Sequence, residues 1–426
     1  MQRGWFNIKY KTEAFDLWQY LCADIYDPLI RCRIDFDGFI DEAMLKRAVM
    51  ASLQTIPMVA CSFGGGCCRP RWNDKGFDAE DMVRVLKVSK AAETDVLKCL
   101  SAGIDFANEP QLKILIVRKH AGDTLCIIIS HIVCDGAGFK QYLYLLSELY
   151  TKLKNNEPAV IPAFFQRDIK PLFANVTLRE RLKILRSEYN AYESANKTEQ
   201  PGIDFELGNP VKAMEKRIIS PEYFNKLKLF AKANNVTVND CLMALFARSF
   251  CKNTGTNKIL LPSTMDLRKF IPQGHLYGIS NYSSNCMCHI FIKPNDSLSD
   301  TAAHVSRQMN NYKSEKNILK SVMLWGLAAR APWSLLKCKF HKYAVQPVIS
   351  FTNLGVIDKQ RLNFDSLNIN YAYLTASIKP RPYLQLTAST YNNSCTLGCN
   401  IYGSEADKSF VRRLLSDMYM EIKTQK

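Results

Sequence analysis

Residues 125–138 have the sequence LCIIISHIVCDGAG, and apolar residues at helical spacing begin directly after them at Phe139. The five consecutive apolar residues that open this segment predict a strand covered on both faces. His131 follows the strand, and Asp135 and Gly136 form a tight turn before the helix. A histidine at a rigid strand end, beside a turn where the backbone can approach a substrate, is typical of a reactive side chain.

His131 is the candidate for proton transfer, because imidazole gains and loses a proton near neutral pH. This role requires that one ring nitrogen is held as a donor while the other is free to accept. The alternative is a structural role, which is the more common one for an isolated histidine. The apolar strand before it, Asp135 four residues later and the glycines at 136 and 138 favour the catalytic role.

The composition is that of a globular protein. The chain has 426 residues, 47% hydrophobic and 23% charged, which is enough for two cores of ordinary domain size. Lysine plus arginine exceed aspartate plus glutamate by 56 − 40, a formal charge of +16, and this favours anionic partners. Nucleic acid is not predicted, because the basic residues are scattered and no zinc-finger spacing, RNA-binding aromatic motif or dense arginine run accompanies them. Phosphate-bearing small molecules, acidic carrier proteins and an anionic membrane surface remain open.

The N-terminal residues and the fifteen cysteines bear on the cellular compartment. The first residues lack the apolar core of an export signal, so we expect reduced thiols and a cytoplasmic location. Residues 286–289, Cys-Met-Cys-His, and the pair Cys67-Cys68 offer metal-ligand types, but no second pair at ligand spacing completes a site. Buried structural cysteine is therefore the favoured interpretation. No apolar run reaches the ~20 residues that a membrane-spanning helix needs.

Strands and helices mix in both halves, which predicts an α/β (α+β) pair of similar domains. The first half is predicted to have strands at 29–36, 83–88, 113–117 and 125–129, a helix capped by Asp41, a helix from 139, and a basic helix at 178–192. The second half is predicted to have strands at 215–219, 259–261, 281–292, 348–351, 368–374 and 384–391, and helices from 221, at 241–250 and at 405–422.

Two connecting segments set the predicted domain boundaries. Residues 195–210 hold prolines and glycines among charged residues and form the candidate linker. The predicted N-terminal domain is then 1–160, the connecting helix and linker 161–210, and the C-terminal domain 211–426. Residues 262–268 are predicted to be a loop after a short buried strand.

Residues 130–136, Ser-His-Ile-Val-Cys-Asp-Gly, resemble the HHxxxDG signature of one superfamily of acyltransferases. This superfamily contains nonribosomal peptide condensation domains, chloramphenicol acetyltransferase, plant BAHD acyltransferases and condensation-like alcohol O-acyltransferases. Ser130 replaces the first histidine, as in relatives that keep only HxxxDG, and His131 corresponds to the second, catalytic one. Five further segments resemble other landmarks of this superfamily and occur in the same order. They are residues 29–60, 106–112, 236–240, 262–268 and 350–355. The resemblance implies two chloramphenicol-acetyltransferase-like halves in a V-shaped pseudo-dimer, with the active site in a tunnel between them.

The resemblance also implies roles for the motif residues. His131 would be the general base that takes a proton from an acceptor hydroxyl or amine as it attacks an acyl thioester. Asp135 would turn away from the substrate and pair with Arg268, so that the pair locks the turn that aims His131. Gly136 would give the backbone room beside the substrate, and its N–H could assist the oxyanion. The alternatives are an ordinary turn aspartate and a solvated arginine.

The second half is expected to supply further donors to the site. Thr352, Asn353 and Ser350 lie where related enzymes bring a strand across the tunnel, so they are candidates for the oxyanion or the pantetheine arm. Asn281 and Ser283 are weaker candidates. The alternative for all of them is that polar residues at strand ends satisfy the neighbouring backbone.

The resulting hypothesis is a stand-alone acyltransferase that moves an acyl group from a thioester to an alcohol or amine. The donor would be acyl-CoA or an acyl-phosphopantetheine on a separate acyl or peptidyl carrier protein, the acceptor a small molecule, and no metal or bound cofactor is implied. Three rivals are an amide-forming condensation enzyme with separate carrier proteins, a catalytically inactive partner-binding relative, and a basic adaptor with an incidental turn. A monomer is expected.

An amphipathic segment at residues 322–336 stands apart from these motifs. It carries tryptophans and leucines, with lysines just behind, a combination that suits peripheral contact with a membrane. Such a stripe more often forms core or lines an acceptor tunnel, and that is the favoured interpretation.

Overall fold

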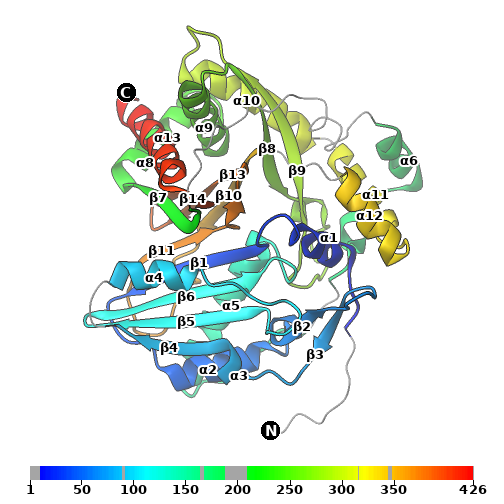
Figure 1. Cartoon of the computed structure of the whole chain (residues 1–426), viewed down its shortest axis with the longest axis vertical. Coiled ribbons are helices and arrows are strands. Elements are labelled where there is room, and N and C mark those ends of the chain that lie inside the picture. Colours follow the sequence, from blue (N-terminus) through cyan, green and yellow to red (C-terminus); the bar gives the residue numbers. More distant parts are fainter. Residues whose placement is uncertain are drawn as a thin grey trace.

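The computed structural model describes residues 10–88, 92–163, 167–187, 209–314, 316–343 and 348–425. The chain forms two α/β halves, each built on its own sheet, one below the other in Figure 1. The fold class predicted from the sequence is confirmed.

The N-terminal half has a five-stranded sheet in the order β11-β1-β6-β5-β4. Its strands are β1 (Leu29–Phe36), β4 (Val83–Lys87), β5 (Leu112–Lys119), β6 (Gly122–Ser130) and β11 (Ile369–Thr375). Every residue of β6 is buried, as the apolar run predicted. Helices α2 (Glu42–Ser52) and α5 (Gly136–Lys154) pack on one face of the sheet, and α4 (Ala92–Leu100) packs on the other.

The helix predicted after Asp41 forms for the predicted reason. Asp41 is the N-cap of α2, and its side chain accepts a hydrogen bond from the Met44 N–H at 3.0 Å, which satisfies a backbone donor that has no partner within the helix. The first half also contains α1 (Ala14–Cys22) and α3 (Ala79–Met82), whereas α6 (Leu178–Arg186) packs against the C-terminal half, where Ile184 joins the core. A separate hairpin of β2 (Cys61–Gly64) and β3 (Arg71–Asp74) was not predicted.

The C-terminal half has a seven-stranded sheet in the order β12-β14-β13-β10-β8-β9, with β7 also paired to β14. Its strands are β7 (Val211–Ile219), β8 (Lys258–Asp266), β9 (Ser283–Phe291), β10 (Ile349–Ile357), β12 (Lys379–Pro380), β13 (Leu384–Tyr391) and β14 (Ser394–Gly403). Its helices are α8 (Pro221–Ala233), α9 (Val238–Thr254), α10 (Leu298–Ser314), α11 (Leu319–Ala328), α12 (Trp333–Tyr343) and α13 (Glu405–Thr424). The apolar helix predicted at 241–250 is the buried centre of α9.

One prediction for this half is corrected by the structure, and one strand was not predicted. The loop predicted at residues 262–268 is strand as far as Asp266, because β8 continues its pairing with β9 through Pro262, opposite Met287. Pro262 is tolerated within β8 because β8 is paired with β10 at only one position, Ser263 opposite Phe351, so the missing N–H of the proline breaks no long ladder. The strand that was not predicted is β14, which pairs with both β7 and β13.

One strand crosses between the halves. Strand β11 follows β10 of the C-terminal sheet, yet it pairs antiparallel with β1, from Arg31 opposite Thr375 to Phe36 opposite Ile369. In Figure 1 it is the orange strand beside the blue β1. The predicted boundary at 210 divides the chain in sequence, but the N-terminal sheet takes its edge strand from beyond that boundary. The candidate linker at 195–210 lies almost entirely outside the described residues.

Candidate active site

His131 lies directly after β6, at the face where the two halves meet. Its backbone N–H donates to the Pro28 carbonyl at 2.7 Å, which ties the turn to the start of β1. Four residues later Asp135 is the N-cap of α5, and its Oδ1 accepts from the Gly138 N–H at 2.9 Å. The predicted strand, turn and helix are all present, with the helix beginning at Gly136 rather than at 139.

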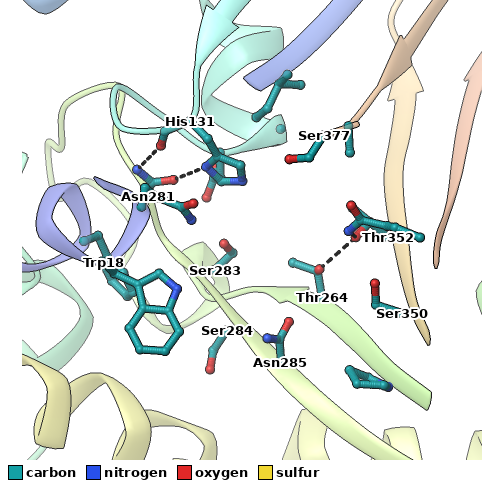
Figure 2. Close-up of a pocket in the computed structure, with 18 of the residues that line it drawn as sticks. Trp18, His131, Thr264, Asn281, Ser283, Ser284, Asn285, Ser350, Thr352 and Ser377 are labelled. Carbon is teal, nitrogen blue, oxygen red and sulfur yellow. Dashed lines mark hydrogen bonds between the residues drawn. The ribbon is translucent and has the colours of Figure 1, made fainter. Parts of the chain in front are cut away.

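Asn281 fixes the orientation of the His131 ring. Its amide nitrogen donates to the His131 carbonyl at 2.8 Å and to the Ile132 carbonyl at 3.4 Å. The amide oxygen therefore faces the ring, and Nδ1 of His131 lies 3.0 Å from it (Figure 2). Because that oxygen can only accept, Nδ1 must carry the proton, and Nε2 is left with a free lone pair. This is the arrangement that a general base requires.

The protonation of His131 follows from its surroundings. Burial lowers the pKa of His131 below its ordinary value, against smaller opposite effects from its own carbonyl, Asp135 and Asn281. The imidazole is therefore neutral at neutral pH, which is the form that can accept a proton.

Asp135 and Arg268 form the contact that the sequence resemblance implies. Nη1 of Arg268 lies 3.0 Å from Oδ2 of Asp135, and Nη2 lies 2.9 Å from Oδ1. The same carboxylate accepts from the Tyr282 N–H at 2.8 Å. Burial alone would raise the pKa of Asp135, but the Arg268 charge and these hydrogen bonds hold it below its usual value. Asp135 is thus an ionised clamp whose oxygens are occupied, and it has no proton to give.

A second arginine, which sequence reasoning missed, holds the same turn. Arg167 donates to the carbonyls of Ile132, at 3.1 Å, and Val133, at 2.5 Å. Its charge is paired with the buried Asp16 of α1 at 3.0 Å. Arg167 lies in a connecting segment without a motif, so only the folded chain shows that it fixes the turn after His131.

Gly136 lies against the C-terminal half. A Cβ atom at this position would come within 2.5 Å of Cδ2 of Leu354, on β10. The missing side chain therefore lets β10 approach the start of α5.

These residues surround a cavity of about 180 Å³ between the two halves. Opposite His131 and Asn281, the wall is polar: the hydroxyls of Thr264 and Thr352 lie 3.2 Å apart, and Gln385 donates to Thr352 at 2.8 Å (Figure 2). Ser350 and Ser283, both predicted site residues, also line the cavity, as do Ser284 and Asn285.

Asn353 does not belong to this wall, so the prediction for it is corrected. Its side chain is exposed and bonds away from the cavity, with Nδ2 donating to Asn239 at 3.1 Å and Oδ1 accepting from the Gly355 N–H at 2.9 Å. Side chains alternate along a strand, so Ser350 and Thr352 share one face of β10 and Asn353 has the other.

The amphipathic segment at 322–336 is divided between two helices, α11 and α12, by the turn before Trp333. Val322 and Trp325 line the cavity, as the tunnel interpretation predicted. Trp325 also packs edge-to-face on Trp18, with ring centroids 4.9 Å apart. On the outside of the same helix, Leu324 and Leu327 are exposed. The inner face of this helix therefore lines the cavity, as the favoured interpretation predicted. Contact of its outer face with a membrane stays a prediction.

The cysteines differ in burial, and the described residues contain neither a metal-ligand cluster nor a membrane-spanning helix. Cys286 and Cys288 are buried on β9, as predicted, whereas Cys67 and Cys68 are exposed, contrary to the prediction. Within the described residues, no three histidine, cysteine or carboxylate side chains come together as metal ligands. None of the helices in the described ranges combines the length and the apolar character that crossing a bilayer requires.

Comparisons with solved structures extend over nearly the whole chain. Trichothecene 15-O-acetyltransferase from Fusarium sporotrichioides matches with a TM-score of 0.69 at 12% identity, over 96% of this chain and 94% of that one. The first condensation domain of the calcium-dependent antibiotic synthetase matches with a TM-score of 0.68 at 14% identity, over 98% and 97%. The chain has the condensation-domain fold. Polyketide synthase associated protein 5 from Mycobacterium tuberculosis, with a TM-score of 0.66 at 15% identity over 95% and 96%, shares this fold.

Comparisons at the level of sequence find no match. No protein-family model matches the chain, and no curated protein matches it. The similarity to solved structures confirms the condensation-domain fold that the motif and the other landmarks predicted. It shows the fold alone, and the chemistry depends on the residues of the site.

Proposed function

We propose that the protein is an acyltransferase that moves an acyl group from a thioester, of coenzyme A or of a carrier protein, to an alcohol or amine. The observation that carries the proposal is His131, whose Nδ1 is held by Asn281 so that Nε2 is the free base in the cavity. The condensation-type fold supports it, because an acetyltransferase and a condensation domain of a synthetase have the same architecture.

In the proposed reaction, Nε2 of His131 takes the proton of the acceptor hydroxyl or amine as the oxygen or nitrogen attacks the thioester carbonyl. The carbonyl oxygen becomes an oxyanion, and fixed donors that match it give most of the rate gain. When the C–S bond breaks, the proton on Nε2 goes to the leaving thiolate, so that the imidazole is neutral again. No metal or redox step is needed for this balance.

We assign two donors to the oxyanion. One is the backbone N–H of Gly136, at the first residue of α5. The other is the hydroxyl of Thr352, which accepts from Gln385 and keeps one proton to donate, either to Thr264 or to a bound carbonyl. Ser350, on the same face of β10, would contact the acyl or pantetheine part of the donor.

The test is transfer by His131→Ala, measured by mass spectrometry with acyl-CoA donors of several lengths, a holo carrier protein, and a panel of alcohols and amines. We expect the variant to lose about 10²- to 10⁴-fold in kcat, the usual contribution of a general base. His120→Ala, at an exposed histidine outside the cavity, is the control. Transfer by His131→Ala at the rate of the control would refute the role of His131, and the product, ester or amide, identifies the class of acceptor.

A further inference from the structure

A buried lysine faces the cavity from the strand that returns the chain to the C-terminal sheet. Lys379 forms β12 with Pro380, directly after the chain has left β11 of the N-terminal sheet, and pairs with Ile401 of β14. Its side chain is only 9% exposed, and it lines the same cavity as His131. No motif in the sequence singles out this residue.

The groups around Lys379 leave its charge without a counter-ion. Its Nζ lies 3.0 Å from the centre of the Tyr26 ring, and the carboxylate whose charge acts on it is that of Asp27. The two carboxylate oxygens of Asp27 are already occupied, one by Arg31 at 2.5 Å and one by the Ile378 N–H at 2.6 Å. Among the described residues, none forms an ion pair with Lys379.

The other titratable groups nearby do not neutralise it either. Cys22 of α1 also faces the lysine, but burial raises the pKa of that thiol to about 11, so it is uncharged at neutral pH. His131, on the other side, would add positive charge if protonated. Burial therefore lowers the pKa of Lys379 itself to about 7, against the weaker opposing effects of Cys22 and Asp27.

The charge balance of the cavity points in the same direction. Among the described lining residues, Lys379 is the only lysine or arginine, and Asp135 is the only carboxylate. Since Asp135 is neutralised by Arg268, the cavity has one positive group that the Tyr26 ring contacts but that no carboxylate of the described lining neutralises. A buried ammonium is stabilised when an anion with good geometry reaches it.

We propose that Lys379 binds a compact anionic group, a carboxylate, on the substrate. This inference rests on the proposed acyl transfer, because it assigns the carboxylate either to the acyl group of the donor or to the acceptor. In the absence of the ligand the lysine loses its proton readily, and it takes one up when the carboxylate arrives. Binding at pH 8 is then accompanied by proton uptake, and the affinity falls up to about tenfold per pH unit above pH 7.

The experiment compares matched pairs of substrates in wild type, Lys379→Met and Lys379→Arg. Succinyl-CoA and butyryl-CoA differ by a carboxylate in place of a methyl group, and 3-hydroxybutyrate is compared with its methyl ester as the acceptor. We expect the wild-type protein to have a kcat/KM at least tenfold higher for the anionic member of one pair than for its neutral member. Lys379→Met should remove that preference, and Lys379→Arg should keep part of it. The ratio within each pair cancels any loss common to both substrates. Lys232→Met, at an exposed lysine of α8, controls for the loss of one positive charge.

Calorimetric titration with succinate and with 3-hydroxybutyrate, in buffers of different ionisation enthalpy at pH 8, tests the site without turnover. Uptake of up to one proton per bound anion in wild type, absent in Lys379→Met, supports the proposal. If thioesters are not turned over but this uptake is seen, the proposed function fails and the anion site stands. If neither pair favours its anionic member, or if Lys379→Met keeps the preference, the proposal is wrong. Thermal melting checks that Lys379→Met folds, and it should melt above wild type below pH 7 because an unpaired buried charge has been removed.

Discussion

The amide of Asn281 decides which nitrogen of His131 can act as a base. Two backbone carbonyls, those of His131 and Ile132, accept from its nitrogen, so the amide cannot rotate without bringing oxygen against oxygen. The tautomer is therefore set by the backbone of the turn. A side chain that lies 150 residues away in sequence supplies this control.

The first prediction concerns the pH dependence of transfer. Because burial lowers the pKa of His131, the acid limb of kcat/KM should lie below pH 6.5, so that most of the wild-type enzyme has a neutral His131 at pH 7. Asn281→Asp places a carboxylate beside Nδ1, which favours the charged ring and should move this limb to higher pH. Asn281→Ala should lower kcat by about 10- to 1,000-fold, a share of the contribution of a general base.

A pH–rate profile for each variant, between pH 4.5 and 9, gives the measurement. Ser283→Ala, which removes a polar side chain from the same cavity, is the control and should leave the limb where it is. An acid limb that stays in place in Asn281→Asp would show that Asn281 supports the fold and does not tune His131.

The residues that sequence reasoning found and missed differ in one respect. His131, Asp135 and Arg268 belong to motifs, and their contacts could be inferred from the resemblance. Arg167 and Lys379 act through contacts that only the tertiary structure creates, and nothing in their local sequence indicates them. The error at Asn353 was avoidable, since neighbouring residues of one strand cannot both face the cavity.

At the level of elements, the turn between β6 and α5 is held from two sides. Arg268 reaches it from the end of β8 and binds Asp135, while Arg167 reaches it from the connecting segment and binds the carbonyls at 132 and 133. Both arginines have their own buried or partly buried carboxylate partners. The position of His131 thus depends on two parts of the chain that lie outside its own turn.

The second prediction concerns the clamp. Asp135→Ala should lower the free energy of unfolding by about 3–5 kcal/mol, because it removes the buried partner of Arg268 and leaves only the half-exposed Asp266 beside that charge. Asp266→Ala is a matched control, since Asp266 binds the same arginine at 3.1 Å with a side chain that is half exposed, and should cost about 0–1 kcal/mol. Urea unfolding of both variants gives the values. Equal costs would show that burial of the Asp135 pair is not what stabilises the turn.

The sign of the pH dependence follows from the lowered pKa of Asp135. Its contribution to stability is present above the unfolded-state pKa of ~4 and is lost as the pH falls through the lower folded-state pKa. Wild type should therefore lose more stability than Asp135→Ala on acidification below pH 4.

At the level of the whole molecule, the two halves share a sheet and a core. Besides β11, the C-terminal half contributes Leu354, Ile357, Leu362 and Phe364 to the core of the N-terminal half. The two-domain architecture could be predicted, because strands and helices alternate in both halves. The crossing of β11 into the N-terminal sheet could not be predicted, because the pairing of β1 with β11 leaves no local pattern in the sequence of either strand.

The third prediction is that the N-terminal half does not fold alone. A fragment of residues 1–187 lacks β11, so it exposes the edge of β1 and part of its core, and should aggregate when expressed by itself. Co-expression with residues 209–426 should yield a soluble complex. As the control, residues 367–378 fused to the first fragment by a flexible linker should restore part of its solubility. A cooperative unfolding transition of the fragment alone would contradict the prediction.

The position of β11 also determines when this protein becomes complete during its synthesis. Residues 29–36 leave the ribosome early, but their partners at 369–375 follow only after most of the chain has been made. Until then the sheet that carries His131 has an open edge, which nascent-chain chaperones would have to protect. A polypeptide that terminates early, for example at residue 360, therefore contains every motif residue named above and still lacks a complete N-terminal sheet.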